Sequence, residues 1–179
     1  LTMNEKINDE IKAPLWMLLE LTHKCPLECP YCYNQLDFAK IDDKMKKEDW
    51  LRVIEEAREM GVVQIGFSGG EPLLNKDLPE LIKKASGLGF YTNLITSGVG
   101  AEEGLVKKLK EAGLKNVQIG IQSSEKEIMT LLTNNKTAYE QKIKFAKEVK
   151  EAGMQIVINA TIHKLNRDHV DKIIEFAHN

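Results

Sequence analysis

Short apolar runs alternate with longer amphipathic segments along almost the whole chain. Apolar runs of strand length predict β-strands at residues 15–21, 62–67, 90–95, 117–121 and 154–160. The segments between them carry apolar residues at helical spacing and predict helices at residues 49–60, 77–87, 101–112 and 137–153, a short helix that begins near residue 124, and a last helix at residues 166–178. The first strand is almost uniformly apolar and is expected to be buried. An acidic residue three positions after Asp77, Ser124 and Thr137 predicts a capping box at each helix start.

A strand followed by a helix, repeated five times, indicates an α/β fold of parallel strands joined by right-handed crossovers. An open doubly wound sheet and a (β/α) barrel, whole or partial, both fit this order. No linker interrupts the series, so we expect one domain at residues 14–179 after a polar arm at residues 1–13. The chain stops where a sixth strand would follow, and we therefore expect an incomplete barrel that ends after the fifth strand–helix unit.

Composition excludes several classes of protein. Of the 179 residues, 42% are hydrophobic and 29% are charged, and the net charge of −2 provides no field that would attract nucleic acid or anionic lipid. No apolar stretch is long enough to cross a membrane. Free thiols without a signal peptide indicate a reducing compartment, so we expect a cytoplasmic protein.

The cysteines Cys25, Cys29 and Cys32 share one short loop directly after the first predicted strand. Three thiolates on one loop can hold three irons of a [4Fe–4S] cluster and leave the fourth iron open to a small molecule. A zinc site with His23 as fourth ligand is the main alternative, although zinc ligands usually come as two separated pairs. A disulfide framework fits poorly with an odd number of cysteines.

A second motif follows the second predicted strand, where Gly69 and Gly70 precede Glu71 and a proline. Two glycines let the backbone approach a ligand closely, and the carboxylate offers a charged acceptor. The ends of all five predicted strands also carry polar residues, and ligands bind at that edge in parallel α/β folds. These residues are Glu20, Ser68, Thr96, Gln122, Asn159 and Thr161.

The two motifs in this order resemble the radical S-adenosylmethionine (SAM) superfamily. The likeness rests on the spacing of the three cysteines, on the aromatic Tyr31 before the third one, and on residues 69–72. It implies a partial (β/α) barrel, with a [4Fe–4S] cluster on Cys25, Cys29 and Cys32.

The same resemblance implies how SAM is bound. The cluster would chelate SAM and cleave it reductively to a 5′-deoxyadenosyl radical. Residues 69–71, with the carboxylate of Glu71, would bind the ammonium group of SAM, and the backbone near Tyr31 would meet the adenine. By position, three further residues would contact the ribose or the methionine carboxylate of SAM: Ser97, Gln122 and Asn159.

A closer resemblance is to the PqqA peptide cyclases of pyrroloquinoline quinone biosynthesis, which join a Glu and a Tyr of a precursor peptide by a carbon–carbon bond. It rests on residues 14–16, 20–22, 25–32, 36–39 and 91–99. It implies a peptide substrate, a small peptide chaperone and an electron donor such as flavodoxin. Tyr33 and Gln35 stand where those cyclases usually have Ser and Pro, so a sister peptide-modifying enzyme, for example a thioether-forming one, remains an alternative. A structural zinc or binding module is the other alternative.

Overall fold

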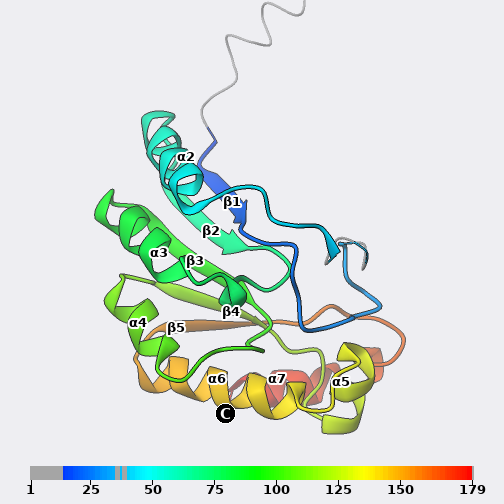
Figure 1. The fold of residues 1–179 in the computed structure, drawn as a ribbon. Helices are drawn as coiled ribbons and strands as arrows, with labels where there is room; N and C mark the ends of the chain where they lie inside the picture. Colours follow the sequence, from blue (N-terminus) through cyan, green and yellow to red (C-terminus); the bar gives the residue numbers. More distant parts are fainter. Residues whose placement is uncertain (1–13, 35–36, 38–39, 179) are drawn as a thin grey trace, which may run out of the picture.

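The computed structural model describes residues 14–34, 37 and 40–178. The predicted polar arm at residues 1–13, and most of the 36–39 segment used in the comparison with the peptide cyclases, lie outside the described residues. The described chain forms one sheet with helices packed against it (Figure 1).

All neighbouring strands are parallel, and their order in the sheet is their order in the sequence. The strands are β1 (Trp16–Glu20), β2 (Gln64–Ser68), β3 (Tyr91–Thr96), β4 (Asn116–Gly120) and β5 (Gln155–Asn159). A doubly wound sheet would reverse this order part-way, whereas consecutive right-handed crossovers place successive helices on one face. The structure therefore confirms the partial (β/α) barrel, as an open sheet of five parallel strands.

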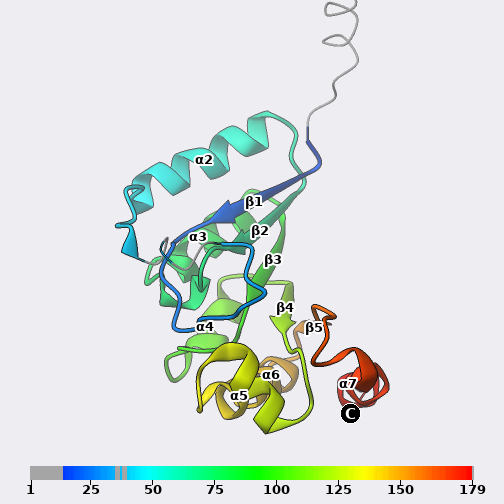
Figure 2. The same ribbon diagram turned by 90° about the vertical axis from the view of Figure 1, so that its right-hand side faces the viewer.

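Helices lie in the crossovers between the strands (Figures 1 and 2). The α-helices are α2 (Lys47–Glu59), α3 (Leu78–Gly87), α4 (Leu105–Glu111), α5 (Lys126–Thr133), α6 (Ala138–Glu151) and α7 (Val170–His178). Short 3₁₀ turns are η2 (Pro72–Leu74) and η3 (Arg167–His169). Helices α2, α3, α4 and α6 lie side by side in that order, and α5 packs against α6.

The hydrophobic core lies between the sheet and these helices. Ile65 and Phe67 from β2 and Leu94 from β3 are fully buried there against helical side chains. The opposite face of the sheet is partly open, because Trp16 of β1 is 46% exposed and Val157 of β5 is 46% exposed. The expectation that the first strand is buried throughout is therefore wrong: alternate residues of β1 face away from the helices.

The predicted capping boxes are also wrong. Asp77 and Thr137 stand at the N-caps of α3 and α6 without a side-chain capping bond, and α5 begins one residue later than expected, with Glu125 at its N-cap. A one-sided cap occurs instead at α2, where the Asp49 carboxylate accepts a hydrogen bond from the Lys46 backbone N–H at 3.0 Å. Within the described residues, every helix is too short or too polar to span a bilayer.

The location of the core predicts that replacing two leucines by alanine has very different effects on the free energy of unfolding. Leu94 is fully buried in β3, whereas Leu131 on α5 is 64% exposed. We expect Leu94→Ala to lower the free energy of unfolding by about 2–5 kcal/mol, because it leaves a cavity in the core. The matched control, Leu131→Ala, should change it by at most about 0.5 kcal/mol. Denaturant unfolding measures both values, and similar losses would contradict this location of the core.

Candidate functional site

The cysteine loop follows β1 at the carboxyl edge of the sheet, where residues 68–71 also emerge from β2 (Figure 1). Glu20 lies opposite Ser68 in the parallel register, so the two segments leave the sheet together. Their backbones stay paired: the Gly70 N–H donates to the Thr22 carbonyl at 2.6 Å, and the Glu71 N–H donates to the Lys24 carbonyl at 2.8 Å. The two motifs found in the sequence therefore form one continuous piece of structure.

The two glycines of this turn are required because the backbone of the cysteine loop lies too close for a side chain. A Cβ atom at Gly70 would lie 2.5 Å from the Lys24 carbonyl oxygen, and one at Gly69 would lie 2.5 Å from the Thr22 carbonyl oxygen. Gly69 also has φ of +142°, a conformation that other residues rarely adopt. The close approach expected toward a ligand is, in this structure, an approach to the backbone of the cysteine loop.

The far side of the cysteine loop is held by the end of α5 and the start of α6. Leu27 is buried and packs with Val99 and Ala138, and the half-buried Cys25 and Cys29 border this small apolar cluster. The Glu28 N–H donates to the Thr133 carbonyl at 3.2 Å. The loop is therefore fixed to the body of the domain on two sides.

The cysteine side chains differ in their surroundings. Burial raises the pKa of the Cys25 thiol to about 11, and burial also raises the pKa of Cys29 although the Tyr31 hydroxyl is hydrogen-bonded to its sulfur. Cys32 is exposed. Nearby thiolate charge raises the pKa of Cys25 and Cys29 further, so the three sulfurs lie within electrostatic reach of one another.

Glu71 lies beneath the loop and is fully buried. Its carboxylate accepts hydrogen bonds from the Thr96 hydroxyl at 2.6 Å, from the Ser97 N–H at 2.8 Å and from the Leu73 N–H at 3.1 Å, and the Ser97 hydroxyl also donates to it. Burial is the main cause that raises the pKa of this carboxyl group, and the hydrogen bonds oppose it. In this structure Glu71 joins the ends of β2 and β3, and its contact with a ligand stays a prediction.

Lys142 of α6 lies at the same edge and is 1% exposed. Its ammonium group donates to the Ser97 carbonyl at 3.0 Å and to the Gly120 carbonyl at 2.7 Å. It therefore connects the ends of β3 and β4 from below, as Glu71 connects β2 and β3.

Tyr31 stacks on His163, which follows β5, with ring centroids 5.6 Å apart and an interplanar angle of 16°. The Nδ1 atom of His163 accepts a hydrogen bond from the Leu165 N–H at 3.2 Å, and its buried Nε2 atom has no partner. The fully buried Asn166 holds this turn, because its amide donates to the Gln122 carbonyl at 2.9 Å and accepts from the His163 N–H at 2.8 Å. The stack therefore connects the cysteine loop with the segment that follows β5.

The remaining residues predicted at the strand ends lie where the sequence placed them. Glu20 ends β1 and accepts a hydrogen bond from the Tyr33 hydroxyl, and Asn159 ends β5 with its side chain exposed. Gln122 is buried just after β4, and its Oε1 atom has no hydrogen-bond partner. The Gln122 oxygen and the His163 Nε2 atom are thus two unsatisfied polar atoms at the edge that carries the cysteine loop.

Sequence reasoning missed Lys142 and Asn166. Lys142 could have been found, because it interrupts the buried stripe of α6 that contains Ala138, Phe145 and Val149. Asn166 was expected only as the start of a helix, and the sequence gives no sign that its side chain would bind two carbonyl groups.

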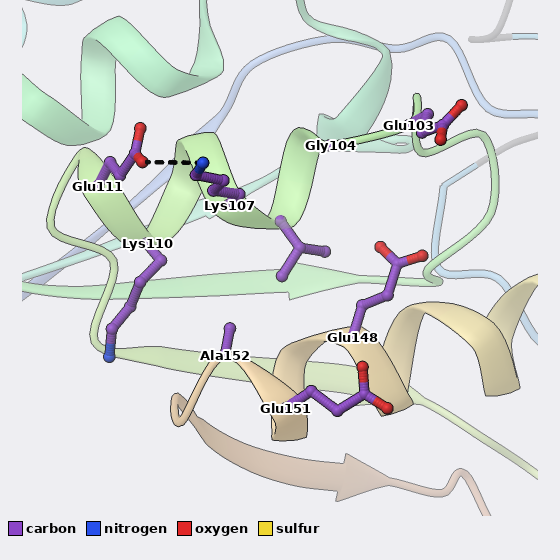
Figure 3. Close-up of a pocket in the computed structure, with 9 residues that line it drawn as sticks. Glu103, Gly104, Lys107, Lys110, Glu111, Glu148, Glu151 and Ala152 are labelled. Atoms are coloured by element: carbon purple, nitrogen blue, oxygen red, sulfur yellow. Dashed lines mark ion pairs between the residues drawn. The ribbon is translucent and has the colours of Figure 1, made fainter.

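A solvent-open hollow of about 580 Å³ lies elsewhere, between α4 and α6 (Figure 3). Exposed charges of both signs line it, including the Lys107–Glu111 pair at 3.9 Å. It lies on the helical layer and contains none of the predicted site residues.

The model of the radical SAM superfamily matches residues 19–177. The chain belongs to the radical SAM superfamily. Radical SAM proteins use a [4Fe–4S] cluster and SAM.

Several solved structures share this fold. SuiB of Streptococcus suis bound to its precursor peptide SuiA has a TM-score of 0.84 at 21% identity, over 97% of this chain and 38% of that one. SuiB bound to SAM has a TM-score of 0.80 at 21% identity, over the same shares of the two chains. The enzyme anSMEcpe with bound AdoMet has a TM-score of 0.73 at 22% identity, over 91% of this chain and 48% of that one. The chain thus spans less than half the length of these proteins.

The donor set on the loop fits a [4Fe–4S] cluster, since its sulfur atoms are the ligands that such clusters take. Within the part of the chain that the structure describes, no three His, Cys, Asp or Glu side chains are gathered into a ready-made metal site. This applies equally to the cluster on the three cysteines and to the zinc arrangement with His23, so the choice between them rests on metal analysis. Because the thiol of Cys25 is protonated at neutral pH, metal binding must displace its proton.

The close contact between the two motifs predicts that adding one methyl group at Gly70 lowers stability and iron content. Gly70→Ala would place Cβ against the carbonyl oxygens of Lys24 and His23, at 2.5 and 2.6 Å. We expect the turn and the loop to separate, with a loss of about 1–3 kcal/mol in unfolding free energy and a lower iron content after reconstitution. Gly87→Ala is the matched control, because a Cβ there meets no atom within 4 Å. Equal stability and iron content in the two variants would contradict the predicted clash.

Proposed function

We propose that the chain is the SAM-cleaving core of a radical SAM enzyme that modifies a ribosomally made precursor peptide, most specifically by joining a Glu and a Tyr side chain in pyrroloquinoline quinone biosynthesis. Membership of the superfamily, together with the cysteine loop paired to the Gly-Gly-Glu turn, carries the first part of this proposal. The likeness to SuiB with its bound peptide supports a peptide substrate. The similarity to the PqqA peptide cyclases in the sequence supports the Glu–Tyr cross-link.

In this proposal, Cys25, Cys29 and Cys32 hold the [4Fe–4S] cluster. When bound, the cluster and SAM supply the reductive cleavage that yields methionine and a 5′-deoxyadenosyl radical. Leu27 and its apolar neighbours exclude water from the inner side of the loop.

SAM would lie along the carboxyl edge of the sheet. Residues 69–71 would receive its ammonium group, and Tyr31, held in place by His163, would border its adenine. Three residues would meet the ribose or the carboxylate: Ser97, Gln122 and Asn159. For Ser97 this contact would use its remaining hydrogen-bonding capacity, because its hydroxyl already donates to Glu71. The enzyme would work in the cytoplasm with an electron donor such as flavodoxin and a small peptide chaperone.

The first test is cleavage of SAM. Anaerobically reconstituted protein should absorb broadly near ~400 nm, as thiolate-ligated clusters do, and should release 5′-deoxyadenosine with dithionite and SAM. Ala at any one of the three cysteines should abolish both signals. Ser86→Ala, a half-buried change in α3 away from the loop, should preserve both. About one zinc and no iron per chain after anaerobic preparation would favour a structural metal site and contradict the proposal.

The second test is the product formed on a peptide. Incubation with a candidate precursor peptide, SAM and reductant should lower the peptide mass by two hydrogens. One hydrogen leaves in 5′-deoxyadenosine, and the other leaves as a proton and an electron passed to an acceptor. Tandem mass spectrometry should place the new bond between a Glu and a Tyr. A cysteine thioether would contradict the cyclase assignment and favour the sister enzyme, while release of 5′-deoxyadenosine would still support the radical SAM assignment.

A further inference from the structure

Lys142 occupies an unusual place in the fold. It lies on the buried stripe of α6, where the neighbouring turns carry Ala138 and Phe145, and its side chain is 1% exposed. Two donors of its ammonium group reach the Ser97 and Gly120 carbonyls. An ammonium group has three donors, so one remains beyond these two carbonyl contacts.

The charge of Lys142 is not paired with a carboxylate. Both of its described hydrogen bonds go to neutral carbonyl oxygens, and it belongs to none of the ion pairs in the described part of the chain. A buried cation without an anion at hydrogen-bond distance is costly. Burial lowers the pKa of Lys142 to about 8, while the charges of Cys29, Glu71 and Cys25 oppose this shift.

Lys142 and Glu71 lie on either side of one residue. The Ser97 N–H and hydroxyl donate to Glu71, and the Ser97 carbonyl accepts from Lys142. Ala138, one helical turn before Lys142 on the buried stripe of α6, packs with Leu27 of the cysteine loop. The cysteine loop is thus packed against the turn of α6 that precedes the buried positive charge.

We propose that Lys142 is a positioning residue whose buried positive charge stabilises the reduced state of the iron–sulfur cluster, while its hydrogen bonds fix the ends of β3 and β4 beneath that cluster. This inference rests on the proposed function, because it requires a cluster at Cys25, Cys29 and Cys32. One-electron reduction adds a negative charge to the site, and a nearby cation favours that state. Solvent screens the interaction weakly, since Lys142 is buried.

The test is the reduction potential of the cluster in the absence of SAM, followed by electron paramagnetic resonance during an anaerobic redox titration. Lys142→Met removes the charge and the donors, whereas Lys142→Gln removes the charge and keeps donors. We expect the ratio of reduced to oxidised cluster at a fixed solution potential to fall about ten-fold in both variants, which is a shift of 59 mV for a one-electron couple. The matched control is Lys144→Met on the same helix, whose side chain is 73% exposed, and it should keep the wild-type potential.

The other outcomes separate this inference from its alternatives. The inference is overturned if either neutral variant holds a full complement of iron and keeps the wild-type potential. This holds even if that variant binds SAM more weakly. If both neutral variants lose the cluster, the Lys142→Arg variant distinguishes the two explanations. If this variant keeps the cluster at the wild-type potential, the charge is needed; if it also loses the cluster, Lys142 acts in folding alone. A wild-type protein that takes up no cluster refutes the proposed function itself.

Discussion

The site depends on the close backbone contact between the cysteine loop and the Gly69–Gly70 turn. Carbonyl oxygens of Thr22 and Lys24 occupy the space where side chains of the turn would lie, so only glycine is compatible with the contact. The contact is possible because β1 and β2 are neighbours in register and end at the same level. The backbone carbonyls at the start of the cysteine loop accept hydrogen bonds from the turn after β2, so the sheet fixes where this loop begins.

The second feature of the site is the burial of two opposite charges that do not touch. Glu71 and Lys142 are both nearly inaccessible, and each is satisfied through Ser97 and neighbouring polar groups. Such an arrangement is weak evidence for stability, since apolar residues of similar volume often stabilise a core equally well. Its specific consequence is geometric and electrostatic. The ends of β2, β3 and β4 are joined in one network that holds a buried carboxyl group and a buried ammonium group.

The sequence predicted the parallel sheet, the helices and the edge that carries the site, because apolar periodicity and strand–helix alternation are local properties. It failed where the outcome depends on contacts between distant segments. The exposed side of β1 depends on what covers the sheet, and the role of the glycines depends on the register of β1 with β2. The stacking of Tyr31 on His163 joins residues 132 positions apart, which no local pattern reports. The unusual position of Lys142 could have been predicted from the sequence, because one charged residue on an apolar helical stripe requires a partner.

The two faces of the sheet differ in composition, because one carries the apolar core and the other carries polar contacts. The side chains that fill the core point toward the helices, and the core is continuous without the opposite face. That opposite face carries polar contacts instead, such as the bond from the Asn116 amide to Asn93 at 2.6 Å and the bond from the Tyr91 hydroxyl to Gln155 at 2.8 Å. Substitutions on the open face leave the apolar core intact, because the core lies between the sheet and the helices.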